Sequence, residues 1–301
     1  MDVFKVSILG CGSAKPTLRH NPSAQIVNFR DNLFLVDCGE GTQLQMLKMK
    51  VKVNRMHHIF ISHLHGDHCY GLPGLLSTLG LMGAQGSITI HLPKGGMELF
   101  KPLTDFAVHN MDIIYEPYEY GNHVIYEDKS LTVNTMPLKH RMECVGFVFR
   151  EKPQPRHIIR EMVDFHKVPV RCMKDIKDGA DFVKDDGTVV PNEVLTKPAD
   201  KPRVYAYISD TLPLKAVSSE VKGADLLYHE ATFGNADAPR AQETCHSTAL
   251  QAATVAKNAE VKRLIIGHYS SRYKEEQDLL KEAQTVFPNT VLANEGLTFD
   301  V

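Results

Sequence analysis

The chain has 301 residues, of which 43% are hydrophobic and 23% charged, with six cysteines and no tryptophan. This composition lets a chain bury a substantial core, so it excludes a disordered protein and a disulfide-stapled miniprotein. The formal net charge of −2 excludes a uniformly basic nucleic-acid coat, although it permits a local basic patch.

Strand-like and helix-like segments alternate along the chain. Short β-branched and aromatic runs bounded by turn residues predict strands at 4–9, 24–29, 33–36, 58–61, 88–92, 131–136 and 145–149. Apolar periodicity predicts helices at 42–49, 72–82 and 97–107. After Lys201 the pattern returns, with strands at 204–208, 226–229, 263–266 and 291–293 and helices at 212–220, 247–256 and 275–286. This alternation predicts an α/β fold with sheet inside and helices outside.

No segment is typical of a signal peptide or a membrane span. The N-terminus carries an acid at Asp2, and the most apolar stretch, 71–83, is short and interrupted by proline, glycine and hydroxyl residues. The six cysteines form no CxxC pair, which is typical of reduced thiols. We therefore expect a soluble cytoplasmic protein that contacts no membrane.

Residues 150–202 do not continue the alternation of predicted strands and helices. The segment holds six prolines and an Asp-Asp-Gly turn, which predicts a projecting and partly irregular insert. Its first part, residues 150–177, has eight Lys or Arg and four acidic residues, so it is basic in an acidic chain. Such a run is either a solvated surface excursion or an arm that meets a polyanion.

The sharpest signal is the segment SHLHGDH at 62–68, which follows an apolar strand and precedes a helix. Imidazole and carboxylate are ligands of zinc and its first-row neighbours. In an extended segment His63 and His65 point to the same side and can share one ion. Beyond the turn at Gly66, Asp67 and His68 can face a second ion. A polar loop with stray histidines is the alternative, but four such side chains buried together need partners.

Three further candidates each lie just beyond an apolar strand, where α/β proteins place functional groups. They are His140 after 131–136, Asp210 after 204–208 and His268 after 263–266. Singly, each is as well explained by a capping aspartate or a loop histidine. With the 62–68 segment they complete a two-metal site.

With these segments in place, the chain resembles the metallo-β-lactamase superfamily and, within it, the ribonuclease Z family of tRNA 3′-processing endonucleases. The matching segments are DCGEGTQ (37–43), SHLHGDH (62–68), GLPG (71–74), KHR (139–141), SDT (209–211), HEAT (229–232), HSTA (246–249) and GHYSSRY (267–273). The resemblance runs nearly end to end. It implies one domain over 1–301, a four-layer αββα sandwich, with 150–202 as a tRNA-binding exosite arm.

Seven positions match the family's metal ligands. The resemblance implies that one zinc ion is held by His63, His65 and His140, a second by Asp67, His68 and His268, and that Asp210 and a hydroxide bridge the two ions of each subunit. We expect Asp37 either to accept a hydrogen bond from a ligand imidazole or to cap a turn.

The implied reaction removes the 3′ trailer from precursor tRNA. Two divalent ions lower the pKa of a shared water, and the hydroxide attacks the phosphodiester in line, leaving a tRNA 3′-hydroxyl. We expect Asp67 to orient this nucleophile or to take its proton. His246, held protonated by Glu230, is the candidate acid for the leaving 3′ oxygen.

The resemblance also implies where the tRNA lies. The loop at 16–21 corresponds to the family's loop for the tRNA end, which assigns Arg19, His20 and Asn21 to substrate binding, although Leu18 and His20 stand where the family carries Lys and Arg. In the arm, the expected phosphate contacts are Arg156, Arg160, Arg171 and Lys174. A homodimer is implied, in which the arm of one subunit binds the tRNA cut by the other.

Two other readings stay open at this point. One is a small-molecule phosphodiesterase or ester hydrolase on the same fold, for which a basic insert has no use. The other is a non-enzymatic RNA-binding protein with a relict site, which would lack some of the seven ligands.

Overall fold

The computed structural model describes residues 3–83, 86–108 and 111–301. The chain forms two compact units. The first comprises Met1–Tyr126, Val133–Phe149 and Val204–Val301, and the second comprises Glu127–Thr132 and Arg150–Arg203.

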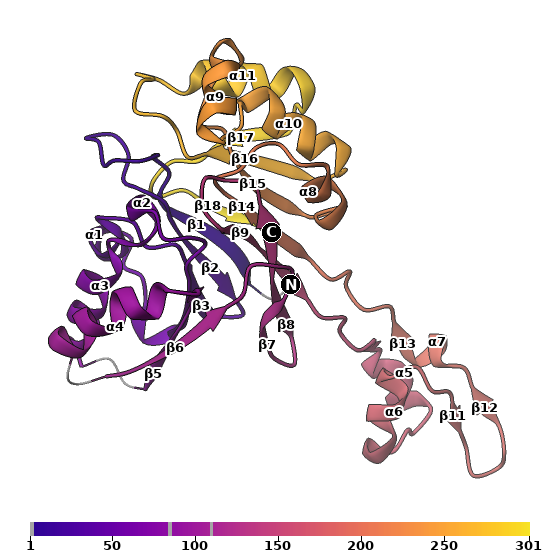
Figure 1. Ribbon diagram of the computed structural model, residues 1–301. Coiled ribbons are helices and arrows are strands. Elements are labelled where there is room, and N and C mark those ends of the chain that lie inside the picture. Colours follow the sequence, from indigo (N-terminus) through magenta and orange to yellow (C-terminus); the bar gives the residue numbers. More distant parts are fainter. Residues whose placement is uncertain (1–2, 84–85, 109–110) are drawn as a thin grey trace. The chain divides into compact units, whose positions relative to one another are not determined.

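Two mixed sheets, each of seven strands within the described residues, form the middle of the fold (Figure 1). The first has the order β18 (Thr298–Asp300), β1 (Phe4–Gly10), β2 (Ala24–Phe29), β3 (Asn32–Val36), β4 (Met56–Phe60), β5 (Ser87–Pro93), β6 (Asp112–Tyr118). The second has the order β17 (Thr290–Leu292), β16 (Arg263–Gly267), β15 (Leu226–Glu230), β14 (Val204–Ile208), β9 (Cys144–Glu151), β8 (Leu131–Leu138), β7 (Val124–Glu127).

Aromatic side chains join the two sheets face to face. The ring of Phe60 on β4 lies 5.6 Å from that of Phe147 on β9, and Phe34 on β3 lies 6.1 Å from Phe149. The hydroxyl of Tyr205 donates to the side chain of Gln25 across the same interface. Edge-to-face and tilted pairs of this kind add to the free energy of apolar burial.

Helices form the two outer layers (Figure 1). Beside the first sheet lie α1 (Thr42–Lys48), η1 (Val53–Arg55), α2 (Gly66–Cys69), α3 (Leu72–Leu81) and α4 (Gly96–Ala107). Beside the second lie α8 (Lys215–Glu220), η3 (Asn235–Asp237), α9 (Ala238–Thr244), α10 (Ala249–Asn258) and α11 (Gln277–Val286). None of the helices in the described residues combines the length and apolar character that a membrane crossing needs. The order helix, sheet, sheet, helix confirms the four-layer sandwich.

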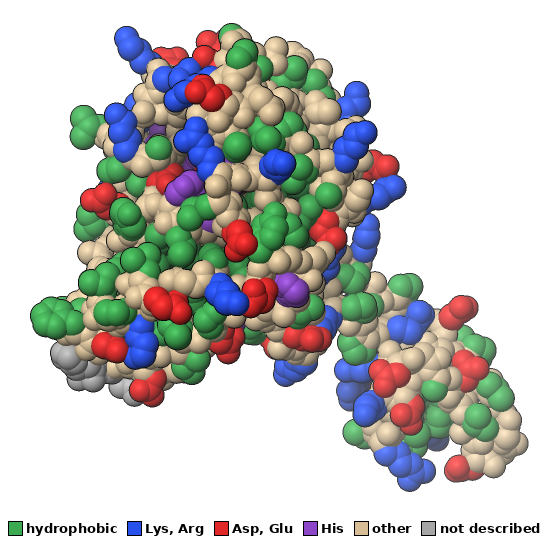
Figure 2. All heavy atoms as spheres, viewed as in Figure 1, with side chains coloured by type: hydrophobic (Ala, Val, Ile, Leu, Met, Phe, Trp, Pro, Cys, Tyr) green, Lys and Arg blue, Asp and Glu red, His purple; other side chains and the backbone are tan. Residues whose placement is uncertain are grey.

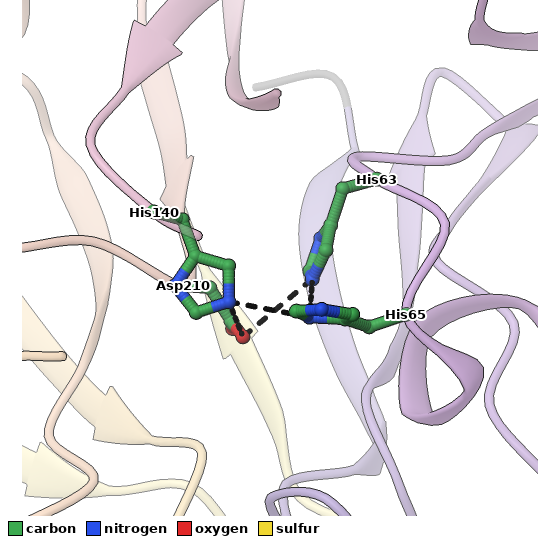
Figure 3. Close-up of side chains that lie close together, drawn as sticks. All are labelled: His63, His65, His140 and Asp210. Carbon is green, nitrogen blue, oxygen red and sulfur yellow. Dashed lines mark hydrogen bonds and ion pairs between the residues drawn. The ribbon is translucent and has the colours of Figure 1, made fainter. Parts of the chain in front are cut away.

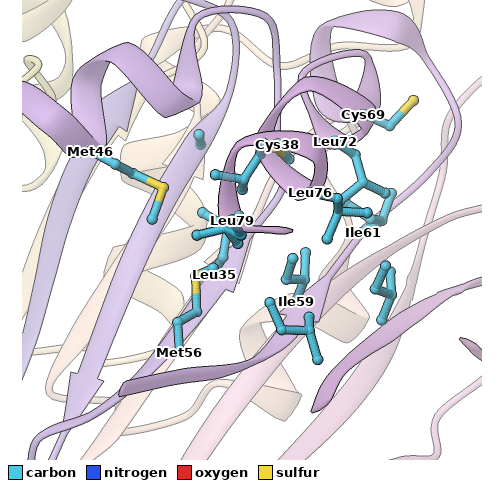
Figure 4. Close-up of a cluster of buried hydrophobic side chains, with 14 of the residues drawn as sticks. Leu35, Cys38, Met46, Met56, Ile59, Ile61, Cys69, Leu72, Leu76 and Leu79 are labelled. Carbon is cyan, nitrogen blue, oxygen red and sulfur yellow. The ribbon is translucent and has the colours of Figure 1, made fainter. Parts of the chain in front are cut away.

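The core between the first sheet and its helices is built from leucine, isoleucine, methionine and cysteine (Figure 4). Leu72, Leu76 and Leu79 recur at helical spacing on α3 and pack toward Ile59 and Leu35 of the sheet. This packing anchors α3 and the preceding α2, and it therefore holds the 62–68 segment, whose last three residues belong to α2.

Apart from the elements of the 150–202 segment, three strands and two α-helices of the described residues fall outside the sequence predictions: β6, β7, β18, α2 and α9. β6 and β7 lie at sheet edges, where only Tyr118 of β6 is buried, so they lack the apolar runs that indicate a buried strand. The helix predicted at 212–220 begins only at Lys215, because Pro213 disfavours helical backbone at the preceding residue. The helix predicted at 247–256 begins at Ala249, since Thr248 is its N-cap in a capping box with Gln251.

The second unit has secondary structure and a core of its own. It contains α5 (Arg160–Phe165), η2 (Val170–Cys172), α6 (Met173–Lys177) and α7 (Asn192–Leu195). Two short antiparallel pairs complete it, β10 (His157–Ile158) with β13 (Thr196–Lys197) and β11 (Phe182–Val183) with β12 (Val189–Val190). Val163, Val168, Ile176, Val190 and Leu195 form the core. The 150–202 segment is thus more ordered than its prolines and its Asp-Asp-Gly turn predict.

Candidate metal centre and active site

Parallel strand pairing brings the candidate residues to one edge of each sheet. β14, β15 and β16 pair in parallel, with Ile208 opposite His229 and His229 opposite Ile266. Asp210, Glu230 and His268 therefore emerge together at the carboxyl ends of these strands. In the first sheet, Val36 pairs with Phe60, so Asp37 lies beside the 62–68 segment.

The first cluster contains His63, His65, His140 and Asp210, whose donor atoms all lie within 4.8 Å of one another (Figure 3). His65 Nδ1 lies 3.0 Å from His63 Nε2 and 3.2 Å from His140 Nε2. Asp210 Oδ2 is 3.6 Å from His63 Nε2 and 3.5 Å from His140 Nε2. Three imidazoles and one carboxylate thus converge on one point.

The second cluster contains Asp67, His68 and His268. The two imidazole Nε2 atoms lie 3.3 Å apart, and Asp67 Oδ2 lies 3.7 Å from His68 and 3.4 Å from His268. Asp210 reaches this cluster too, since its Oδ1 is 3.2 Å from His68 Nε2 and 3.1 Å from His268 Nε2. One Asp210 oxygen therefore faces each cluster.

The donor set fits divalent metal ions. Burial lowers the pKa of His63, His65 and His140, so these imidazoles are neutral near pH 7 and offer lone pairs. Asp67 and Asp210 bring negative charge into the same buried space, and burial alone would raise the pKa of each, yet the surrounding imidazoles lower both. Nitrogen and carboxylate donors at this separation are those of zinc and related ions.

Polar groups behind the clusters orient the ligand rings. Asp37 Oδ2 lies 2.7 Å from His68 Nδ1, so of its two expected roles Asp37 has the contact with the imidazole of a candidate ligand. Thr232 Oγ1 lies 2.9 Å from His268 Nδ1, Ser62 Oγ 3.0 Å from His63 Nδ1, and the Cys245 carbonyl oxygen 3.0 Å from His140 Nδ1. Such contacts select the ring tautomer and turn the other nitrogen toward a metal. The last three were not predicted, because nothing in the spacing relates a hydroxyl or carbonyl to a distant histidine.

Replacing Asp37 by asparagine tests this arrangement. Asp37 is fully buried and also accepts from the Ser62 amide at 2.7 Å and from the Tyr207 hydroxyl at 2.7 Å. The neutral amide holds His68 less strongly, so we expect metal affinity and activity to fall about 10- to 100-fold. Competition with a fluorescent chelator measures the affinity, and an unchanged affinity would contradict the role.

Glu230 and His246 form a charged pair beside the clusters. Glu230 Oε1 lies 2.9 Å from His246 Nδ1 and accepts from the amides of Thr211 and Ser247 at 3.0 Å each. Burial opposes the charge on His246, but Glu230 raises the pKa of this imidazole to about 9. The imidazole is therefore protonated at neutral pH and has the properties of a general acid.

An open cleft leads to the clusters, lined by His65, Asp67, His140, Asp210 and His246. Three arginines that were not singled out in the sequence, Arg141, Arg240 and Arg272, line the same cleft. The guanidinium of Arg272 lies 4.9 Å from the ring centre of Phe233 and 2.7 Å from Asp237 Oδ1. The cleft thus contains positively charged side chains that can bind phosphate groups. The slightly negative net charge of the whole chain gives no sign of them.

The predicted substrate-binding residues are divided between the two units. Arg19 forms an ion pair with Glu276, His20 is buried, and the Asn21 amide donates to Glu295 at 2.9 Å. Arg156, Arg160, Arg171 and Lys174 belong to the second unit. Within it, Arg156 donates to Thr196 at 2.7 Å, and Arg160, Arg171 and Lys174 are exposed, with Arg160 Nε 3.2 Å from Asp164 Oδ2.

Comparisons with known proteins agree with this geometry. The family model of the anti-Pycsar protein Apyc1 matches residues 4–96. Ribonuclease Z of Bacteroides fragilis is 52% identical over 300 residues, covering 99% of each chain, and that of Parabacteroides distasonis is 52% identical over 301 residues with the same coverage. The short form of human tRNase Z is 26% identical with a TM-score of 0.71 over 99% of both chains. The metallo-β-lactamase fold protein YhfI of Bacillus subtilis is 20% identical with a TM-score of 0.71 over the full length of both chains, and shares the fold.

Proposed function

Because the chain belongs to the ribonuclease Z family of metal-dependent endoribonucleases, we propose that it removes the 3′ trailer from precursor tRNA with two zinc ions per subunit. The observation that carries the two-ion proposal is Asp210, whose two carboxylate oxygens each lie within 3.6 Å of a different pair of imidazoles. His63, His65 and His140 would hold one ion, and Asp67, His68 and His268 the other.

The bound ions would supply a nucleophile of lowered pKa and neutralise the phosphoryl oxygens. The chain's own residues do the rest. Asp67, at the cleft wall, orients the attacking water or accepts its proton. His246 donates its proton to the leaving 3′ oxygen of the tRNA, while Glu230 keeps the imidazole protonated and oriented. The arginines of the cleft bind the flanking phosphates.

The decisive experiment uses the zinc-loaded protein and a precursor tRNA with a 3′ extension, with and without a chelator, and maps both product ends. We expect a cut that leaves a tRNA 3′-hydroxyl and a 5′-phosphate on the trailer, abolished by the chelator and restored by zinc. Absence of this cut from protein that holds two ions per chain would instead favour a small-molecule phosphodiesterase or ester hydrolase on the same fold.

The second unit is our candidate for tRNA binding outside the active site. Its exposed cations Arg160, Arg171 and Lys174 suit interactions with the phosphate backbone. Changing all three to alanine should raise KM for precursor tRNA and leave kcat unchanged. It should also lower the salt dependence of binding by roughly one in log–log slope for each phosphate that the variant no longer neutralises.

Binding titrations at several salt concentrations measure that slope. Lys281→Ala is the matched control, because Lys281 is an exposed lysine on α11 of the first unit, 3.0 Å from Asp278. An unchanged slope in the triple variant would rule out these three residues as phosphate ligands.

We also propose a homodimer, supported by an apolar surface on the first unit (Figure 2). The exposed large apolar side chains on and beside α1, α3 and α4 are Leu44, Leu47, Leu81, Met82, Leu99, Leu103 and Phe106. A surface of this kind is typical of a protein interface. Sedimentation of the wild type and of Leu103→Glu tests the dimer.

The six free cysteines suit a reducing compartment, and we propose the cytoplasm as the place of action.

A further inference from the structure

The loop of residues 13–21, here called the N-terminal loop, borders the catalytic cleft through Ser13 and Ala14. The amide of Ala14 donates to Asp67 Oδ2 at 2.7 Å. Ala14 has a φ of 64°, a left-handed backbone conformation that a non-glycine residue adopts only when its surroundings impose it. The direction of this amide therefore depends on what holds the loop.

His20 holds the loop from the side remote from the cleft. It is only 8% exposed, and its ring packs 5.5 Å from that of Tyr269. Its Nδ1 lies 3.0 Å from Glu295 Oε2 and its Nε2 lies 3.3 Å from Glu276 Oε1. Both ring nitrogens thus face carboxylates of the C-terminal part of the chain.

Backbone hydrogen bonds fix the end of the N-terminal loop at His20 and Asn21 relative to its beginning at Gly12 and Ser13. Thr17 N donates to the His20 carbonyl at 2.9 Å, and Gly12 N donates to the Asn21 carbonyl at 2.9 Å. Ser13 N donates to the Tyr269 carbonyl at 3.0 Å, next to the Ala14 amide that contacts Asp67. The path from His20 to Asp67 therefore runs through these backbone hydrogen bonds and the short stretches of peptide chain between them, and it ends at the hydrogen bond of the Ala14 amide.

The charges around His20 favour its protonated form. The groups that face it are Cys11, Arg19, Tyr269, Glu276 and Glu295. Arg19 balances one of the two carboxylates, which leaves one negative charge for the imidazolium. Burial alone would lower the pKa of His20, but Glu295 and Glu276 raise it above its ordinary value. Burial also raises the pKa of Cys11, so this thiol remains neutral.

We propose that His20 is a positioning residue for catalysis: clamped between Glu276 and Glu295, it holds the N-terminal loop so that the Ala14 amide orients the carboxylate of Asp67. The proposal rests on the catalytic role of Asp67 in the proposed function. It differs from the tRNA contact that the sequence suggested, because a buried ring with both nitrogens facing carboxylates has no donor to offer RNA.

Two variants and two substrates test it. His20→Gln removes the charge, and His20→Arg makes it permanent. With zinc-loaded protein, His20→Gln should lower kcat about tenfold toward both precursor tRNA and bis(p-nitrophenyl) phosphate, with little change in KM for the tRNA. A small phosphodiester cannot reach an RNA-binding residue outside the cleft, so an equal loss on both substrates indicates an effect through Asp67.

The pH profile gives a second readout. The charge on His20 is lost as pH rises through its raised pKa, whereas arginine keeps its charge. The ratio of kcat for His20→Arg to that for wild type should therefore be constant at low pH and rise at alkaline pH. Loss of the proton on His246 affects both proteins and cancels in the ratio.

The matched control is His91→Gln, a buried histidine whose Nδ1 lies 3.2 Å from Glu116 Oε2 and which does not line the cleft. We expect it to change thermal stability without changing kcat. A loss confined to precursor tRNA in His20→Gln would overturn the proposal, as would a flat pH ratio. The ligand atoms of Cys11, His20 and Glu295 lie within 4.8 Å of one another, so this group could hold a metal ion. A third bound ion that disappears in Cys11→Ala would overturn the proposal too, since a metal would then hold the loop. If wild type leaves precursor tRNA intact but the small-substrate effects appear, the proposed substrate is wrong and the positioning role stands.

Discussion

Asp210→Asn should strongly lower activity and weaken metal binding at both proposed sites. The substitution keeps the shape of the side chain and removes the negative charge that lies between four imidazoles, at 3.1 to 3.6 Å. Because one oxygen faces each cluster, a single change weakens both sites. Two ions supply several kcal/mol of transition-state stabilisation, so we expect kcat to fall about a thousandfold or more.

The measurement pairs elemental analysis of the purified variant with single-turnover cleavage of precursor tRNA. We expect zinc to fall from two ions per chain to fewer than one. Asp225→Asn is the matched control, because Asp225 precedes β15 at the opposite end of the same strands, where it accepts from the Val204 amide at 2.8 Å and pairs with Lys262. A variant of Asp210 that retained both ions and its rate would exclude the bridging position.

His246→Ala should lower kcat toward precursor tRNA by about a hundredfold to ten-thousandfold, the range for loss of a general acid. The 3′ oxygen of a ribose is a poor leaving group and needs a proton, whereas p-nitrophenolate leaves without one. The same variant should therefore lose much less activity toward bis(p-nitrophenyl) phosphate. An equal loss on both substrates would mean that His246 acts on the cleft as a whole and not on the leaving group.

The pH dependence of kcat distinguishes the role of His246, the proposed acid, from that of its partner Glu230. The pKa of His246 is raised to about 9, so its charged form is present below that pH and is lost above it. Wild-type kcat should fall on the alkaline side near pH 9, and His246→Ala should lack this fall. Glu230→Gln removes the charge that raises the pKa, so the fall should move toward the ordinary value for histidine.

The Glu230→Gln variant needs a stability control, because Glu230 also forms hydrogen bonds within the fold. Glu230 is fully buried and accepts four hydrogen bonds from Thr211, Thr232 and Ser247. The Glu230→Gln variant is therefore compared with wild type by thermal unfolding as well as by rate. A lowered Tm with an unmoved pH profile would assign Glu230 to structure alone.

The seven candidate metal ligands could be identified in the sequence, because each lies at a position that local sequence patterns mark, and the structure brings their side chains together in two clusters. His63, His65, Asp67 and His68 are nearly contiguous, and the others follow apolar strands that periodicity detects. The residues at 30–32 likewise favour a hairpin, and Arg30 and Asp31 have the positive φ values of 51° and 67° that its tight turn needs. Local chemistry and strand periodicity are encoded over a few residues, so one sequence suffices for them.

The tertiary structure alone decided which groups face one another. Glu276 and Glu295 lie more than 250 residues from His20, and only the folded chain turns that side chain inward and places the Ala14 amide on Asp67. The hydroxyl of Thr232 and the carbonyl of Cys245, which set the direction of two ligand rings, are ordinary groups in the sequence. Local periodicity specifies which face of a strand is buried, but the partner of a buried polar group depends on packing between distant elements.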